Sequence, residues 1–409
     1  MIIQKVSTIA AHVILSAGLA IVTAFAGYLI FVEALERARV EQLDSYITVR
    51  AQRDQALFEQ AENLNLAAER VFLRRLTGLE DVDIDSNFDR LFPVLDDGTR
   101  RSVPALFEGM REPDGDYVFG VGAFLGDGDT MSNDAKRRYL AAYQTVRSVG
   151  EANLDQFSSL YFFTPDRRVV IFAPNRPDRL EFYRFDAPSD FDLRGDEDAD
   201  LVNLDLNPDS VMQCTRLSRY VYEDAGERAA IACRKPVRNG DDLLGSFGTS
   251  MVMDTYLSAA VEQPPAHGVN MLFDRDGNLI SRGQSGDAQS IADEAQINAI
   301  GLISHIDSEA ASIGVFRDPG SPFLVAYAKM PRSGWYFVSI VHDRSLTQRA
   351  LYWRQMLLFL VFGLSMTVAF LRGLAVQLKP FGRLRRFGAG ARRDAKNTSP
   401  DPTDPEINV

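Results

Sequence analysis

The sequence has few of the residues from which metal and catalytic sites are usually built. Its 409 residues include two cysteines and four histidines, and no histidine lies within five residues of another. The phosphate-binding loop, the His-Glu-x-x-His motif and the Gly-x-Ser-x-Gly motif do not occur. Asp274, Asp276 and Asn278 resemble the start of a calcium loop, but Leu279 and Ser285 replace its required glycine and glutamate. We therefore expect no catalytic residues, no metal site and no cofactor.

Net positive charge is confined to the C-terminal end of the chain. The formal net charge is −12. The part from Arg372 onward contributes +4 and residues 1–35 contribute zero, so the region between them carries −16. A region this acidic repels phosphate, which argues against nucleic-acid binding. The last stretch, 396–409 (KNTSPDPTDPEINV), is too polar to form a core, and we expect it to be disordered.

Two long apolar segments predict transmembrane helices. Residues 9–32 (IAAHVILSAGLAIVTAFAGYLIFV) contain no aspartate, glutamate, lysine or arginine. The second segment, 351–376, has an uncharged core at 356–371, with Trp353 and Arg372 near its two ends. At ~1.5 Å per residue, such helices suit a hydrocarbon layer of ~30 Å. A cleaved signal peptide or a buried core helix is the alternative, but the apolar lengths and the basic flank favour two membrane spans.

The basic tail predicts the orientation in the membrane. By the positive-inside rule the tail lies in the cytoplasm, and two crossings return the N-terminus to the same side. Residues ~36–350 then lie outside, which is the periplasm if the chain belongs to the inner membrane of a bacterium. The arginines after the second span also suit anionic lipid headgroups.

Between the spans, the pattern predicts one long helix followed by two α/β units. Residues 33–80 lack proline and repeat apolar residues at three and four, so this helix packs on its own domain, forms a dimer stalk, or does each over different turns. Strands and hairpins recur in each unit, which predicts two antiparallel five-stranded sheets with helices on one side. The distal unit is expected to have a strand over 117–125 and a helix over 134–149 with Ser132 as its N-cap, and the proximal unit a helix over 291–304. The expected segments are a cytoplasmic N-terminus, a span, a stalk helix, a membrane-distal unit, a membrane-proximal unit, a helix with the second span and a basic tail (1–8, 9–32, 33–80, 81–253, 254–345, 346–376, 377–409).

Two hairpins resemble those of a known family. LYFFTPDRRVVIFAP at 160–174 and VNMLFDRDGNLIS at 269–281 are similar to the paired hairpins of double Cache domains, the tandem PAS-like sensors of bacterial transmembrane receptors. The resemblance implies an α+β fold with a long N-terminal helix and two PAS-like sheet units, and ligand sensing in the distal unit. The Arg-x-Trp-Tyr element of the amino-acid-binding subfamily is missing; the nearest text is RLEFYR at 179–184. QLKPFGRLRR at 377–386 resembles the start of a HAMP linker.

The expected ligand site lies in the distal unit. Aromatic side chains alternate onto one face of a strand at Tyr161 and Phe163. Arg179 is suited to hold a carboxylate or phosphate group in an otherwise acidic domain, with Tyr183 and Tyr220 nearby. The alternative is that the aromatic residues are core and Arg179 pairs with an acidic neighbour such as Glu181.

The two cysteines are expected to form a disulfide. Cys214 and Cys233 fall on neighbouring strands around a turn, and the periplasm is oxidising. The alternative is two buried free thiols.

These features predict a receptor without enzymatic activity that senses a small extracytoplasmic molecule. We expect it to act as a homodimer and to pass a helix motion to a cytoplasmic signalling protein such as a kinase or cyclase, since only ~33 residues follow the second span, far fewer than the ~100–150 of a typical domain. Two alternatives stay open: a membrane-anchored scaffold that binds envelope proteins, and the sensor portion of a longer histidine kinase or cyclase.

Overall fold

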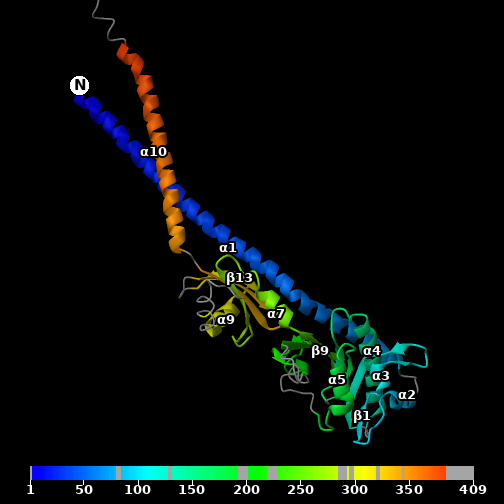
Figure 1. Cartoon of the computed structure of the whole chain (residues 1–409). Coiled ribbons are helices and arrows are strands. Elements are labelled where there is room, and N and C mark those ends of the chain that lie inside the picture. The colour runs from blue at the N-terminus through cyan, green and yellow to red at the C-terminus, as the bar shows by residue number, and fades with distance from the viewer. Residues whose placement is uncertain are drawn as a thin grey trace, which may run out of the picture. The chain divides into compact units, whose positions relative to one another are not determined.

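The computed structural model describes residues 2–79, 84–127, 131–166, 168–191, 201–219, 229–283, 293, 299–318, 323–342 and 345–383. The chain divides into two compact units (Figure 1). One combines the two ends of the chain, up to Arg39 and from Arg344 on, and the other spans Val40–Asp343.

The unit formed by the chain ends contains two apolar helices. They are the first part of α1 (Ile2–Gly78) and α10 (Ser345–Arg383). Large apolar side chains on both are exposed, among them Ile30 at 68% and Phe362 at 65%, whereas a helix in a soluble core would bury them. Both helices are long and apolar enough to cross a membrane, which agrees with the two predicted spans. The first span and the predicted stalk are parts of one helix.

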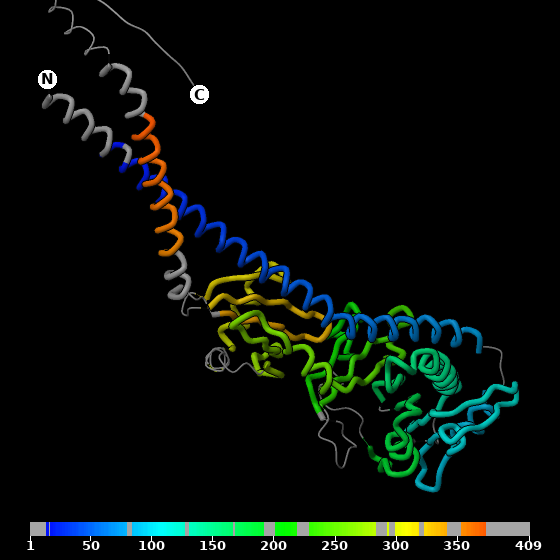
Figure 2. The backbone as a smooth tube through the Cα atoms, turned by 45° about the horizontal axis from the view of Figure 1, so that its top comes forward, coloured from blue at the N-terminus to red at the C-terminus, as the bar shows by residue number. Residues whose placement is uncertain are grey.

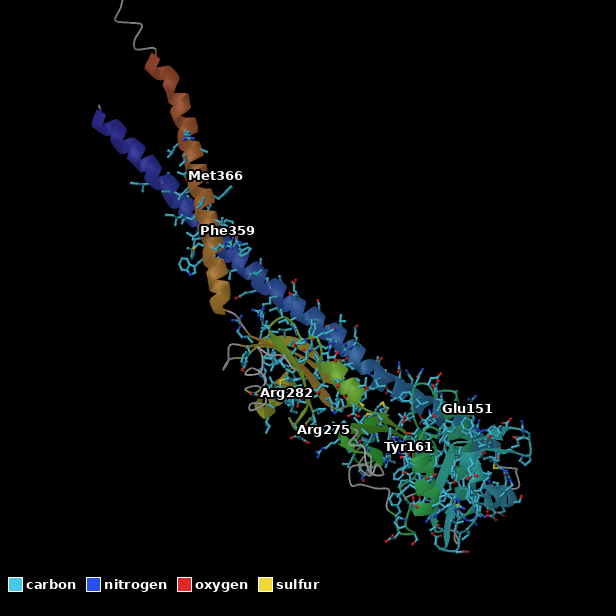
Figure 3. The ribbon with its side chains drawn as sticks, viewed as in Figure 1. Glu151, Tyr161, Arg275, Arg282, Phe359 and Met366 are labelled. Atoms are coloured by element: carbon cyan, nitrogen blue, oxygen red, sulfur yellow. A yellow bond between two sulfur atoms is a disulfide. The ribbon has the colours of Figure 1, made fainter. Side chains whose placement is uncertain are left out.

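Small residues bring these two helices close together. A Cβ atom on Gly363 would lie 3.1 Å from the Cβ of Ala20, and one on Gly27 would lie 3.6 Å from the ring of Phe359. Figure 3 labels Phe359 on α10. In lipid, where no hydrophobic effect drives helices together, this kind of close backbone approach favours their association.

The first sheet of the other unit has eight strands rather than the predicted five. Its order is β1-β4-β6-β5-β10-β9-β7, with β8 pairing to β9, and every pairing is antiparallel. The short strands β1, β7 and β8 account for the difference. Its strands are β1 (Thr99–Arg101), β4 (Val121–Asp127), β5 (Leu160–Phe163), β6 (Val169–Phe172), β7 (Gln213–Cys214), β8 (Ser218–Arg219), β9 (Ala229–Asn239) and β10 (Asp242–Val252).

The helical segments that accompany this sheet include α2 (Ile84–Leu91), α3 (Ala105–Glu108), α4 (Asn133–Glu151), α5 (Pro177–Glu181) and the π-helical turn η1 (Phe182–Asp186). α4 begins as predicted, because the hydroxyl of Ser132 accepts a hydrogen bond from the Ala135 amide. The strand predicted over 117–125 is instead split into β3 (Tyr117–Val118), which pairs with β2 (Met110–Arg111), and β4. Gly120 causes the break: its φ is +68°, and a Cβ there would lie 2.6 Å from Pro174 Cβ.

The second sheet has the predicted five strands. Their order is β12-β11-β15-β14-β13, again antiparallel throughout. The strands are β11 (Gly268–Phe273), β12 (Leu279–Arg282), β13 (Ile313–Arg317), β14 (Phe323–Met330) and β15 (Trp335–His342). Two helices accompany them, α7 (Asp254–Val261) and α9 (Ala299–Ser308). The helix predicted over 291–304 is α9, which extends further toward the C-terminus; most of 284–298 lies outside the described residues.

The later turns of α1 pack against both sheets (Figure 2). Phe58 makes edge-to-face contacts with Tyr256 and Trp335, with ring centroids 5.7 Å apart in each pair. Phe72 stacks on Phe162 at 4.9 Å and meets Phe247 edge-on. Burial of each phenylalanine contributes roughly 1.5–3 kcal/mol. This part of the stalk helix therefore belongs to the core of its own chain, the first of the two alternatives expected for it.

Candidate functional site

One face of the first sheet gathers most of the predicted site residues. Tyr161 and Phe163 lie two residues apart on β5 and therefore point to the same side. They share a buried cluster with Tyr183 from η1, and the exposed fractions are 5%, 2% and 5%. Gly248, opposite Tyr161 on β10, leaves room for the tyrosine ring, since a Cβ there would lie 2.7 Å from it. Figure 3 labels Tyr161 on this sheet.

Arg179 lies on α5, one of the segments packed against β4. It is 8% exposed, and its neighbour Leu180 belongs to the same buried cluster as the tyrosines. α5 continues directly into η1, so Arg179 and Tyr183 are positioned by one short helical segment. A π-helical turn is rare and is often found at functional sites. Tyr220, the fifth predicted residue, lies outside the described residues.

The sequence analysis missed Arg234, which lies on this face. It is 7% exposed on β9, and its Nε donates a hydrogen bond to Tyr161 Oη at 3.2 Å. Its guanidinium carbon lies 5.4 Å from the ring centroid of Tyr161 and 4.8 Å from that of Phe163. Such cation–π contacts are stabilising when they are desolvated. The only signal in the sequence was an arginine inside a predicted strand, and nothing there showed which face it takes.

Two further arginines lie near the edge strand β1. Arg101 is 2% exposed; its Nη2 donates to Asp97 Oδ2 at 2.9 Å and to the Ala187 carbonyl at 2.7 Å, and its guanidinium covers the ring of Phe124. Hydrogen bonds from Thr99 and the charge of Arg101 hold the pKa of Asp97 below its usual value. Burial and then Arg101 lower the pKa of Arg184, while Asp97 opposes them. Arg101 is therefore paired with the Asp97 carboxylate, whose charge also acts on Arg184.

This arrangement favours an anion. Arg101 and Arg234 cover rings of the buried aromatic cluster, and Arg179 and Arg184 adjoin its members Leu180 and Tyr183 in sequence, in a region whose net charge is −16. Among the residues that the structure describes, the buried Nη1 of Arg101 and Nε of Arg184 have no hydrogen-bond partner. Guanidinium groups bind carboxylate and phosphate in a bidentate manner. Across the same described part of the chain, no three His, Cys, Asp or Glu residues cluster as metal ligands would.

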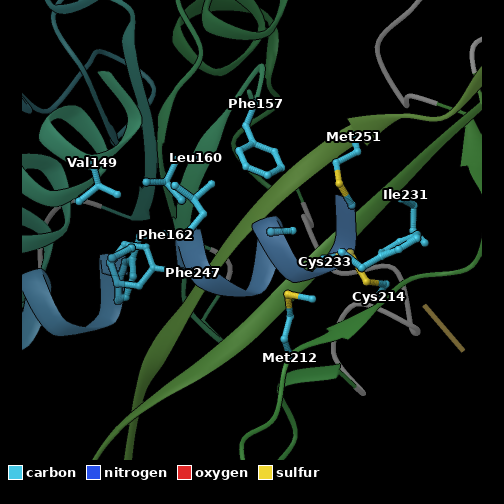
Figure 4. Close-up of a cluster of buried hydrophobic side chains, with 14 of the residues drawn as sticks. Val149, Phe157, Leu160, Phe162, Met212, Cys214, Ile231, Cys233, Phe247 and Met251 are labelled. Carbon is cyan, nitrogen blue, oxygen red and sulfur yellow. A yellow bond between two sulfur atoms is a disulfide. The ribbon is translucent and has the colours of Figure 1, made fainter. Parts of the chain in front are cut away.

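The disulfide expected from the sequence is present. Cys214 on β7 and Cys233 on β9 are register partners, and their sulfur atoms are 2.02 Å apart. Both cysteines are buried at the edge of the main hydrophobic cluster, as Figure 4 shows beside Ile231. The bond ties the edge strand β7 to the long strand β9, which also carries Arg234.

No protein-family model and no curated protein matches the chain. Among solved structures, the chain is similar to the ligand-binding domain of the Pseudomonas fluorescens chemoreceptor CtaA in complex with L-alanine (14% identity, 51% of this chain, 81% of that chain, TM-score 0.30). It is also similar to the ligand-binding domain of the Pseudomonas aeruginosa PAO1 chemoreceptor PctB in complex with L-Arg (16% identity, 49% of this chain, 76% of that chain, TM-score 0.31). A third similar structure is the sensory domain of the Campylobacter jejuni chemoreceptor Tlp3 (10% identity, 74% of this chain, 94% of that chain, TM-score 0.36).

Proposed function

We propose that this chain is a membrane-bound receptor that senses a small anionic molecule outside the cytoplasm. One observation carries the proposal: an acidic region places buried arginines on a single aromatic sheet face, next to a short helix. Because guanidinium groups bind carboxylate and phosphate, arginines beside aromatic rings suit a small molecule that carries such a group. Arg179 and Arg234 would hold the anionic group, and the ring faces of Tyr161 and Phe163 would contact the apolar part of the ligand.

A conformational change caused by ligand binding would be transmitted along the continuous helix α1. The helix runs from the first apolar segment to the packing against both sheets without a break. At the other end, β15 finishes at His342 and α10 begins at Ser345, so little chain separates the second sheet from the second apolar helix. A ligand shifts the equilibrium between two conformations of the receptor only if it binds one of them more tightly than the other. A change in the sheet would therefore reach the apolar helices as a helix motion.

The charge pattern supports an orientation in the membrane, and the proposed receptor also has a dimeric form and a cytoplasmic partner. Both termini would lie in the cytoplasm of a bacterial cell, with residues ~36–350 in the periplasm and the basic flank of α10 among anionic lipid headgroups. A homodimer would be the functional form, and a cytoplasmic kinase or cyclase would receive the signal. The HAMP-like start at 377–386 is where such output would begin; residues from 384 on lie outside the described part of the chain.

A thermal-shift screen of the full chain in detergent tests the proposal. The panel would contain carboxylates, amino acids and phosphate esters, each compared with sodium chloride at equal ionic strength. A ligand at 100 times its dissociation constant raises the unfolding free energy by about 2.7 kcal/mol. We expect at least one anion to raise the melting temperature.

Variants then locate the binding site. Arg179→Gln and Arg234→Gln should each weaken the identified anion by about tenfold or more, because each removes a charge-assisted hydrogen bond. Arg111→Gln is the matched control: it removes the same charge from the distal unit but lies exposed on the separate β2–β3 hairpin. Full affinity in the Arg179 and Arg234 variants would show that the assigned face is wrong.

A further inference from the structure

A cavity of about 390 Å³ lies where the strand β7 of the first sheet meets the turn between β14 and β15 of the second. Its walls include Gln213 on β7, Arg275 in the β11–β12 turn, and Lys329 and Arg332 beside the β14–β15 turn. Twelve residues line it; three of them are cationic and none is acidic. In a region with a net charge of −16, a lining with three cationic residues and no acidic one is unexpected.

Arg275 is the cation best placed to take a ligand. Among the residues that the structure describes, no carboxylate forms an ion pair with it. Gly334, in the facing turn, has φ +71°, and a Cβ there would lie 2.8 Å from Arg275 Nη2. A glycine at this position therefore lets the guanidinium lie directly against the turn at the cavity wall. Figure 3 labels Arg275.

The other two cations have structural partners that fix their positions. Lys329 Nζ donates to the carbonyl of Glu309 at 2.7 Å, just beyond the C-terminus of α9. In the described part of the chain, no carboxylate forms an ion pair with Lys329; its Nζ contacts backbone carbonyls only. Arg332 pairs with Glu62 at 2.6 Å and with Glu59 at 3.3 Å, both on α1. Arg275 and Lys329 therefore supply the net charge, whereas Arg332 anchors the turn to the stalk helix.

We propose that this cavity is a second anion site, which takes a small molecule through a carboxylate or phosphate group. Arg275 binds two oxygens of the group in the bidentate geometry that guanidinium favours, and Lys329 adds a point charge. Gln213 lines the cavity on the β7 side. None of Tyr161, Phe163, Arg179 and Arg234 lines this cavity, and the proposal does not depend on the function proposed for those residues.

Because of the position of the cavity, a bound anion would connect elements of the two sheets. One wall belongs to β7, which the disulfide ties to β9 of the first sheet. The opposite wall is the turn that Arg332 fixes to α1. An anion held by both walls cross-links the first sheet to the second sheet and the stalk helix. Binding here stabilises one arrangement of these elements over any other in which the walls separate.

Titration calorimetry on the full chain in dodecyl maltoside tests the site with inorganic phosphate and, separately, with acetate. Heat from either anion, beyond that of sodium chloride at equal ionic strength, is the expected result; phosphate alone or acetate alone identifies the preferred group. Arg275→Gln should weaken binding by about tenfold or more. Arg275→Lys keeps the charge but loses the planar guanidinium group, so its affinity should lie between those of the wild type and Arg275→Gln. Arg275 is exposed, so unfolding curves without anion should match the wild type.

Two control variants distinguish anion binding at this cavity from binding at other cationic residues. Arg216→Gln removes an exposed arginine that pairs with Asp276 nearby but does not line the cavity, and it should leave phosphate affinity unchanged. The double variant Arg179→Gln/Arg234→Gln should also keep this binding, which distinguishes it from the site on the first sheet. The proposal is overturned if neither anion binds beyond the salt control, if Arg275→Gln binds like the wild type, or if Arg216→Gln weakens binding equally.

Discussion

At the scale of residues, buried arginines distinguish this chain. Arg101 and Arg234 are both less than a tenth exposed, and each covers an aromatic ring. The alternation on β5 was enough to place Tyr161 and Phe163 on one face, since period two is a property of any strand. Arg234 could not be assigned in this way, because it meets Tyr161 across 73 residues of sequence, through strand pairings that no local pattern specifies.

The disulfide gives a prediction at this scale. A Cys214→Ala/Cys233→Ala variant should be less stable than the wild type by about 3 kcal/mol, because the bond closes a loop between positions 19 apart and so restricts the unfolded chain. Unfolding of the detergent-solubilised chain, with and without reductant, measures the difference. Quantitative thiol labelling of the native, unreduced protein would contradict the bond itself.

At the scale of elements, a buried polar contact fastens α1 to the end of α7. Nη2 of Arg50 donates to the carbonyls of Ala260 and of Glu262, the latter at 2.9 Å, so a stalk arginine caps the C-terminus of α7. Burial raises the pKa of Asp54, and Arg53 and Arg50 oppose that rise. The hydroxyl of Tyr256 on α7 donates to the Asp54 carbonyl.

We expect Arg50→Met to destabilise the chain by about 3 kcal/mol, because the carbonyls at the end of α7 lose their donor and the buried Asp54 carboxylate keeps only Arg53 as a cation. The loss should grow with pH. Without Arg50 the pKa of Asp54 rises further above its unfolded value of 3.8, and stability present at low pH is lost as the pH passes through that folded pKa. Thermal unfolding at pH 4 and pH 8 measures this.

The control for Arg50 lies on the same helix. Arg70 is exposed, and its Nε donates to the Leu66 carbonyl within α1. Arg70→Met should change stability by less than about 0.5 kcal/mol, as is usual for surface positions. An Arg50→Met protein as stable as Arg70→Met at both pH values would show that the contact contributes nothing to holding α1.

At the scale of the whole molecule, the dimer is the feature most open to test. Gln42, Ser45 and Val49 are exposed and lie on one face of α1 at helical spacing, so they are available to a second copy. Single cysteines at these positions should form cross-links between copies in native membranes. The background is low because both native cysteines are in the disulfide.

Ile47→Cys is the comparison for this experiment. Ile47 is fully buried against the chain's own sheets, so a cysteine there should not cross-link. Cross-linking at the exposed positions alone supports the dimer on this face. Absence of cross-links at all three exposed positions, together with monomeric behaviour in detergent, would reject it.

Properties that depend on local pattern followed from the sequence alone. Apolar length gave the two membrane-type helices, alternation gave the hairpins and the five strands of the second sheet, and Ser132 gave the start of α4. Cys214 and Cys233 were paired correctly because their strands are neighbours in the chain. The extra strands of the first sheet, the place of Arg234 and the cavity at Arg275 were decided only by tertiary structure. Each depends on which distant segments meet, and that is set by packing a shared core, whereas local propensity constrains a residue only through its neighbours in sequence.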